Sequence, residues 1–235
     1  MPGKCPGQDT RYWKPGDIYE STCPKCGQPV EFFKDEIRRK CRKCGHLFLN
    51  PKLDLGCAKW CQYAEQCVGA LGKDELKETL SLAMKEYFGD DKKRIDHALK
   101  VTEFAEKILE RGEEGNPQVV IGAGLLHDIG IHEAEKKYGS SKGSYQEKEG
   151  PPIAKEIMNK LGWKDGVIKE VCRIIGNHHS PGKIDTLNFK ILTDADWLVN
   201  LRDEYDITDK EKLKKLISRI FLTKTGKKMA EEIYL

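Results

Sequence analysis

The stretch PQVVIGAGLLHDIG, residues 117–130, decides how the rest of the sequence is interpreted. Asn116 and Pro117 predict where this helix starts, because asparagine is a good N-cap and proline suits the first helical turn. Gly130 predicts where it closes. The residues between are apolar or small on every side, which is typical of a helix buried all round. His127 and Asp128 lie at its end, where burial is costly unless a hydrogen-bonded pair or a divalent metal satisfies both groups.

Other polar residues share this buried setting. His97 lies at helical spacing from the apolar residues that follow it, which places it on the inward face of a helix. Asp196 has the same relation to its apolar neighbours within NFKILTDADWLVNL, residues 188–201. His178 and His179 directly follow the apolar segment VCRIIG, residues 171–176. A random scatter of solvated polar groups would not produce this placement.

The ordered set of His97, His127-Asp128 and Asp196, together with LLHDIG at 125–130, resembles the HD superfamily of metal-dependent phosphohydrolases. The resemblance covers roughly residues 74–202. It implies an all-helical domain in which these four residues bind one divalent metal. Members with two metals have further histidines before the last aspartate, and His178 and His179 match that pattern.

A further ligand position is altered in this sequence. Where some two-metal members have a histidine ahead of a Gly-Pro helix start, EGPP at 149–152 offers Glu149. A glutamate ligates iron, manganese or zinc, so Glu149 is kept as a candidate ligand. The mixed nitrogen and oxygen donors favour iron(II), manganese, cobalt, nickel or zinc over magnesium.

Such a metal would lower the pKa of a bound water from 15.7 toward about 7 to 9, so that hydroxide attacks phosphorus near neutral pH. Asp128 is suited both to ligate the metal and to orient this water, with Glu133 or Glu149 as a candidate base. Lys142 is the candidate phosphate contact. It lies in the polar, Gly/Ser-rich stretch 136–150, which predicts a surface loop that closes over the substrate.

Eight of the nine cysteines fall in the first 67 residues, which predicts a separate Cys-rich module over residues 1–72 and a helical domain over 73–235. Cys23, Cys26, Cys41 and Cys44 form two Cys-x-x-Cys knuckles whose spacing suits one structural zinc in a zinc ribbon. Short strands are expected around VEFF and IRRKCRK, and positive φ angles at Gly27 and Gly45. A second site is predicted from the remaining cysteines of the module, with zinc, an iron-sulfur cluster or simple burial as the alternatives. These cysteines are Cys5, Cys57, Cys61 and Cys67.

Beyond residue 72 the patterning is helical. Besides the helix at 117–129, helices are predicted over 74–88, 91–111, Pro151 to Gly162, 165–176, 187–202, 209–222 and 225–234. Cys172 is expected to be a small core residue. The C-terminal segment is suited either to pack on the domain or to form a dimer contact, and the sequence does not separate the two.

Composition limits the function classes. Hydrophobic residues make up 38% and charged residues 34%, as in ordinary globular proteins, and no apolar run approaches the roughly 18 residues that span a bilayer. With no secretory signal, a cytoplasmic location is expected. The formal charge of +3 is too small to argue for a polyanionic partner. The preferred function is a phosphohydrolase acting on a small phosphorylated substrate, a nucleotide. The alternatives are an HD nuclease whose ribbon holds RNA or DNA and a non-catalytic, metal-stabilised binding module.

Overall fold

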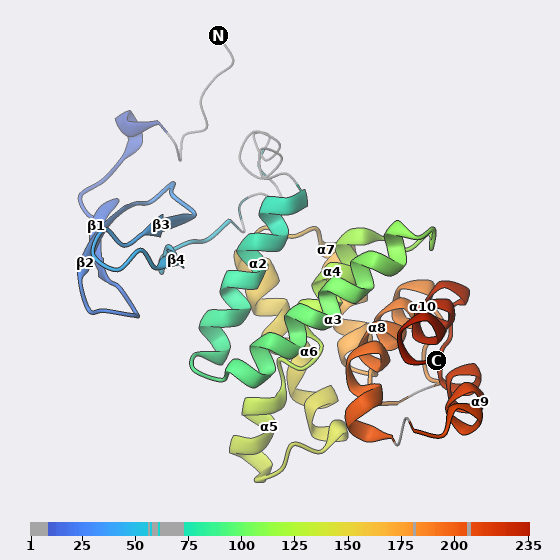
Figure 1. Ribbon diagram of the computed structural model, residues 1–235. Coiled ribbons are helices and arrows are strands. Elements are labelled where there is room, and N and C mark those ends of the chain that lie inside the picture. Colours follow the sequence, from blue (N-terminus) through green and yellow to red (C-terminus); the bar gives the residue numbers. More distant parts are fainter. Residues whose placement is uncertain (1–8, 56, 58–60, 62–72, 181, 206–207) are drawn as a thin grey trace. The chain divides into compact units, whose positions relative to one another are not determined.

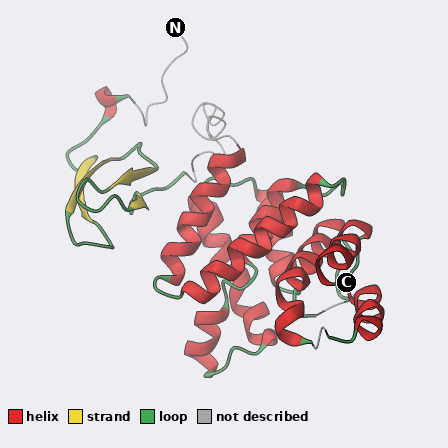
Figure 2. Cartoon of the chain, in the orientation of Figure 1, coloured by secondary structure: helices red, strands yellow, loops and turns green. Residues whose placement is uncertain are grey.

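The computed structural model describes residues 9–55, 57, 61, 73–180, 182–205 and 208–235 (Figure 1). The chain divides into two compact units, one formed by Met1–Glu86 with Ile157–Lys164 and the other by Tyr87–Glu156 with Asp165–Leu235. Within the described residues, strands occur only in the first unit, and helices build the second (Figure 2). The predicted mostly helical fold with a small short-strand module at the N-terminus is confirmed. The boundary expected at residues 72 and 73 borders a stretch outside the described residues and stays a prediction.

The first unit contains two small antiparallel hairpins. After a short 3-10 helix, η1 (Thr10–Tyr12), strand β1 (Ile18–Thr22) pairs with β2 (Pro29–Phe33), and β3 (Arg38–Lys40) pairs with β4 (Leu47–Leu49). The strands expected around VEFF and IRRKCRK are β2 and β3. Gly27 and Gly45 have φ angles of 71° and 72°, as the knuckle turns require. Phe32 and Phe48 meet edge to face between the hairpins and form a small core with the buried Cys23 and Cys41.

A long helix, α2 (Lys73–Phe88), lies mostly in the first unit. Its polar side chains reach the hairpins there. The Glu86 carboxylate accepts a hydrogen bond of 2.8 Å from the backbone N–H of Leu49, and Glu78 forms an ion pair of 2.6 Å with Arg38. The strand β4 is therefore fixed by backbone pairing on one side and by α2 on the other.

The second unit is organised around α4 (Pro117–Leu126), which packs against α3 (Lys92–Glu110), α7 (Asp165–Ile175) and α8 (Leu187–Glu204). From Val119 to its end every residue except the half-buried Ile121 is buried, as expected for a helix covered on nearly every side. Asn116 caps the helix by accepting hydrogen bonds from the backbone N–H groups of Gln118 and Val119. At Gly124 a Cβ atom would lie 2.8 Å from the hydroxyl of Thr102, so the glycine allows α3 to approach closely.

The C-terminal segment forms α9 (Lys210–Ile220) and α10 (Lys224–Tyr234), and α10 packs on α8. The buried carboxylate of Asp194 on α8 anchors the connection between them. It accepts hydrogen bonds from the backbone N–H groups of Leu222 and Thr223 and from the Thr223 hydroxyl, at 2.7 to 2.8 Å. Cys172 is half-buried in α7. Among the described residues, none of the helices combines the length and apolar character that crossing a bilayer requires.

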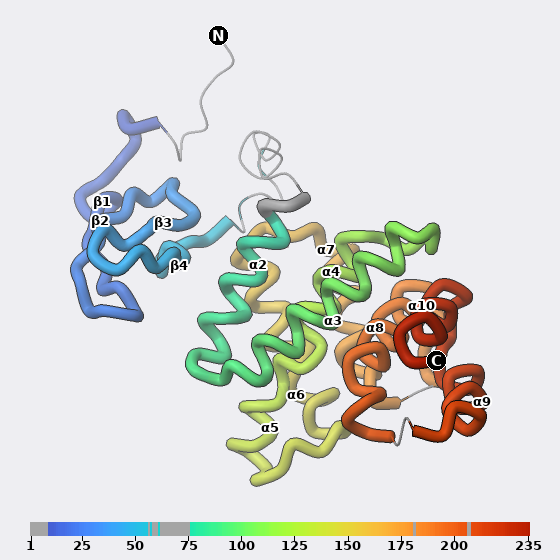
Figure 3. Tube along the Cα trace, viewed as in Figure 1, coloured from blue at the N-terminus to red at the C-terminus, as the bar shows by residue number. Residues whose placement is uncertain are grey.

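The surface loop predicted over residues 136–150 is wrong. This stretch forms the end of α5 (Ile131–Tyr138) and the beginning of α6 (Gly143–Lys160), and only residues 139–142 connect them (Figure 3). Gly139, with φ at 63°, ends α5, and the rings of Tyr138 and Tyr145 stack across the turn. The sequence predicted that Pro151 and Pro152 start a helix. In the structure they lie inside α6, which begins at Gly143. Tertiary contacts thus outweighed the weak helical signal of a polar, glycine-containing stretch.

Candidate metal centre

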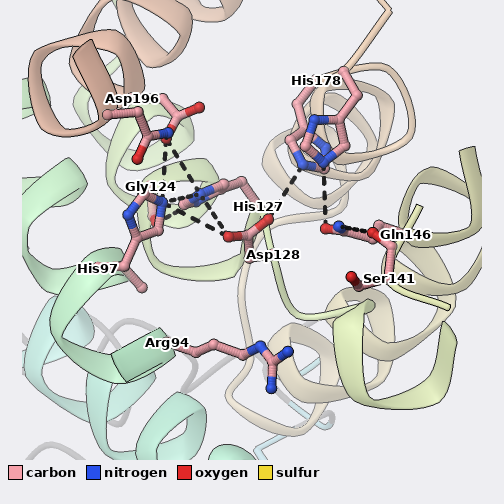
Figure 4. A network of polar contacts seen from close by, with 12 residues as sticks. Arg94, His97, Gly124, His127, Asp128, Ser141, Gln146, His178 and Asp196 are labelled. Carbon is pink, nitrogen blue, oxygen red and sulfur yellow. Dashed lines mark hydrogen bonds and ion pairs between the residues drawn. The ribbon is translucent and has the colours of Figure 1, made fainter. Parts of the chain in front are cut away.

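Three helices bring two histidines and two aspartates to one point in the second unit (Figure 4). His97 comes from α3, His127 and Asp128 directly follow α4, and Asp196 comes from α8. His97 Nε2 lies 3.1 Å from His127 Nε2 and 3.2 Å from Asp196 Oδ1. Asp128 Oδ2 lies 3.4 Å from His127 Nε2 and 3.7 Å from His97 Nε2. The structure thus brings together all four residues that the HD resemblance had implied.

These distances fit a shared metal ion. Four ligand atoms arranged tetrahedrally at about 2.1 Å from a metal are about 3.4 Å apart. The recorded separations within the group run from 3.1 Å between the two imidazoles to 3.9 Å between His127 Nε2 and Asp196 Oδ1. Two imidazole nitrogens facing each other beside two carboxylates are suited to hold a cation, because buried charge is costly unless it is paired.

The electrostatics of the group point the same way. Burial raises the pKa of Asp128, but the neighbouring His127 outweighs it and keeps the pKa well below the usual value. Burial lowers the pKa of His127, yet the carboxylate of Asp128 raises the net pKa to about 9. The pKa of Asp196 is lowered against its burial by the hydrogen bond from His97. Both carboxylates therefore stay ionised, and the site favours a positive charge.

Backbone carbonyls fix which nitrogen each histidine offers. His127 Nδ1 lies 2.9 Å from the carbonyl oxygen of Gly124, and His178 Nδ1 lies 2.7 Å from that of Ile175. Since a carbonyl only accepts, both Nδ1 atoms carry a proton, so Nε2 is the nitrogen of each ring that faces the site and is available to a metal. His178 Nε2 is buried without a hydrogen-bond partner in the described part of the chain and lies 3.5 Å from Asp128 Oδ1.

A second group of potential ligands therefore adjoins the first and shares Asp128. One ligand atom from each of Asp128, His178 and His179 lies within 4.8 Å of the others. His179 is held by α6. Its backbone N–H donates to Glu147 at 3.0 Å, and a Cβ at Gly143 would lie 2.7 Å from its ring. The Asp128 carboxylate thus presents one oxygen to each group.

The remaining candidates from the sequence lie outside both groups. Glu149 accepts hydrogen bonds from Lys137 Nζ at 2.6 Å and from the Tyr138 hydroxyl at 2.8 Å, which ties α6 to α5. These donors, Lys137 first, lower the pKa of Glu149. Glu133 is paired with Lys137 at 3.2 Å within α5. Lys142 is exposed in the connection that precedes α6.

Sequence reasoning missed one buried polar residue beside these ligands. Gln146 is only 6% exposed, and its side chain faces His179. It was assigned to a loop because the stretch around it is polar. The helical spacing of Gln146 and Gly150, which is buried against Gly130, was the available signal.

The first unit holds a separate cluster of four cysteines. The Sγ atoms of Cys23 and Cys44, and those of Cys26 and Cys41, are 3.7 Å apart. Four sulfurs about 2.3 Å from a tetrahedral zinc ion are about 3.8 Å apart, so the cluster fits zinc. Within the cluster, the backbone N–H of Cys44 leads the groups that lower the pKa of the Cys41 thiol to about 7, whereas the pKa of the Cys26 thiol is raised to about 12, so a proton is retained on Cys26. The second predicted cysteine site includes Cys5 and Cys67, which lie outside the described residues, so that site stays a prediction.

Comparisons with known proteins agree with this geometry. A family model described as HD domain matches residues 94–201. A crystal structure described as a predicted HD superfamily hydrolase from an uncultured Thermotogales bacterium is similar, with 30% sequence identity and a TM-score of 0.50. The match covers 67% of this chain and 84% of the other. A search of curated proteins finds no match.

Proposed function

Because this chain belongs to the HD superfamily, a class of metal-dependent hydrolases, we propose that it hydrolyses a phosphate ester of a nucleotide. One observation carries the proposal. His97, His127, Asp128 and Asp196 come from separate parts of the chain, yet their ligand atoms converge at the separations that one metal ion requires. The second group around His178 and His179 extends the site by a further metal position.

The bound group would be a divalent transition metal such as iron, manganese, cobalt, nickel or zinc. When bound, it lowers the pKa of a coordinated water toward about 7 to 9 and stabilises charge on the phosphoryl oxygens. The chain supplies the rest. Asp128 directs Oδ2 toward His97 and His127 and Oδ1 toward His178, so it would hold a metal with either group and orient the attacking water.

Two residues near this site are assigned supporting roles. Lys142 directly precedes α6, whose first residue, Gly143, packs on His179. An ammonium group there, beside the N-terminal end of an 18-residue helix, would stabilise a phosphate. Glu133 lies in the first turn of α5, five residues after Asp128, and is the proposed base.

For the first unit we propose a structural zinc held by Cys23, Cys26, Cys41 and Cys44. The cluster occupies the small core of the two hairpins, where few apolar residues are available. A metal that links both knuckles supplies the stabilisation that so small a core lacks. This role places no demand on the helical unit and adds no chemistry to it.

The proposal is tested with purified protein loaded with Mn²⁺ or Fe²⁺ and assayed against nucleoside mono-, di- and cyclic phosphates. Asp128→Ala and His97→Ala should lose at least 100-fold of the hydrolysis rate while circular dichroism shows an intact fold. Asp203→Ala, which removes an exposed aspartate from the same helix as Asp196, is the control and should retain full activity.

Two outcomes would contradict the proposal. Failure of the metal-loaded protein to hydrolyse any phosphate ester would leave a non-catalytic binding module. Cleavage of an oligonucleotide, with binding that falls steeply as salt rises, and no turnover of nucleotides would identify a nuclease instead.

A further inference from the structure

The buried side-chain amide of Gln146, on α6, lies beside His179 of the second group. Its Nε2 donates a hydrogen bond of 2.6 Å to the backbone carbonyl of Ser141, which fixes the orientation of the amide. The carbonyl oxygen Oε1 is thereby turned toward His179 and lies 3.3 Å from Nε2 of that ring. An amide oxygen held in this way is an acceptor with little freedom to turn away.

Glu149, which the sequence offered as the α6 ligand, is committed elsewhere. Both of its oxygens accept hydrogen bonds from α5, one from Lys137 and one from Tyr138. Moving Glu149 to a metal would break an ion pair of a side chain that is only 8% exposed. Gln146 lies one turn earlier on the same helix and already faces the histidines.

The second group needs a further donor. Asp128, His178 and His179 provide three ligand atoms, whereas metals with nitrogen and oxygen ligands commonly take five or six. The 3.3 Å between Gln146 Oε1 and His179 Nε2 falls within the 3.1 to 3.9 Å range seen between ligand atoms of the first group. An amide oxygen is also an accepted ligand for hard divalent ions.

We propose that Gln146 Oε1 is a ligand of the second metal position, together with Asp128, His178 and His179 and in place of Glu149. The inference rests on the proposed function insofar as it requires a metal beside His178. In this arrangement the hydrogen bond to Ser141 orients Gln146 Oε1, the one uncharged oxygen among the four proposed ligands, toward the ion. The same bond links the position to the 139–142 connection, which contains Lys142 and leads into α6.

A titration of the metal-free, full-length protein with Mn²⁺ tests this ligand directly. Calorimetry counts the equivalents, and Mn²⁺ prefers oxygen and nitrogen donors to the thiolates of the first unit. Gln146→Leu should weaken binding of the second equivalent about 10- to 100-fold and leave the first unchanged. Gln146→Glu should tighten the second equivalent about tenfold or more, because a carboxylate replaces a neutral oxygen. Glu149→Gln and the control Gln118→Leu should stay within about twofold of wild type.

Three results would overturn the inference. The first is wild-type binding of a single equivalent, which would still leave one-metal hydrolysis intact. The second is weakening by Glu149→Gln with no effect of Gln146→Leu. The third is weakening by Gln146→Leu without tightening by Gln146→Glu, which would make Gln146 a hydrogen-bond partner of His179 only. Conversely, the predicted metal affinities in a protein that hydrolyses nothing would support this ligand and refute the proposed function.

Discussion

Replacing Gly130 by alanine tests why a glycine follows the His-Asp pair. The backbone at Gly130 has φ at −76° and ψ at −11°, which alanine adopts without strain. The added Cβ, however, would lie 2.5 Å from the carbonyl oxygen of Gln146 and 2.6 Å from the backbone nitrogen of Gly150. Both neighbours are backbone atoms of α6 and cannot rotate away, so the start of α5 and α6 must separate.

The expected cost follows from this overpacking. Extra methyl groups in packed interiors cost about 1 to 3 kcal/mol, and a collision with two backbone atoms of α6 belongs at the upper end, about 3 kcal/mol. With a urea m-value of about 2 kcal/mol/M, the midpoint of unfolding should fall by about 1.5 M. Because Gln146 itself is displaced, the second metal equivalent should also bind more weakly.

Urea unfolding followed by circular dichroism at 222 nm measures this change, with Gly166→Ala as the matched control. Gly166 lies in the first turn of α7, and a Cβ there meets no atom within 4 Å. The control should be stabilised by up to about 1 kcal/mol, because alanine favours helix over glycine. A Gly130→Ala midpoint within about 0.3 M of wild type would refute the packing argument.

Three further predictions concern separate parts of the chain. Asp194→Asn should lower the free energy of unfolding, measured in urea, by about 2 kcal/mol without changing Mn²⁺ binding. The asparagine replaces one carboxylate oxygen by an N–H₂ group, which cannot accept the hydrogen bond from the backbone N–H of Leu222 or Thr223. An unchanged free energy of unfolding would contradict this. Cys41→Ser should remove one equivalent of zinc by elemental analysis and leave the helical signal and hydrolysis intact; a loss of hydrolysis would contradict the independence of the two units. Stability should also depend on Asp91, whose pKa is lowered to about 2, first by the hydrogen bond from His132. A folded-state pKa below the usual 3.8 contributes stability above pH 3.8 that is lost as the pH falls from 3.8 toward 2. Asp91→Asn keeps the helix cap and should show a shallower loss of the urea midpoint between pH 5 and 2.5; an unchanged slope would contradict the assignment.

Helix periodicity in the sequence was sufficient for most of the second unit. The pattern predicted α3, α4, α7, α8, α9 and α10 with ends within a few residues of those observed, because each has a continuous apolar face or is buried all round. It failed for α5 and for the first half of α6. The stability of that region comes from specific contacts, such as Tyr138 on Tyr145 and Lys137 with Glu149, and hydropathy does not encode them.

In the candidate metal centre, too, some residues were predictable from the sequence and others depended on tertiary contacts. The sequence was sufficient to group His97 and Asp196, on inward helix faces, with the His127-Asp128 pair at a helix end, because a buried polar residue needs a partner wherever it lies. Glu149 was offered as a ligand from a pattern of neighbouring residues, although its orientation depends on how α5 and α6 cross. That crossing is set by Gly130 and Gly150, which approach each other closely across the two helices. Gln146 could not be assigned until the crossing was known.

The positions of His127 and His178 explain how such a site is prepared before any metal arrives. Both residues follow buried helices, α4 and α7, whose last carbonyl groups lack the N–H partners of a continuing helix. Each histidine donates Nδ1–H to the carbonyl three residues earlier, that of Gly124 or Ile175. The same bond satisfies a helix end, fixes the orientation of the ring and directs Nε2 toward Asp128. His97, by contrast, lies within α3 and is placed by the inward face of that helix alone.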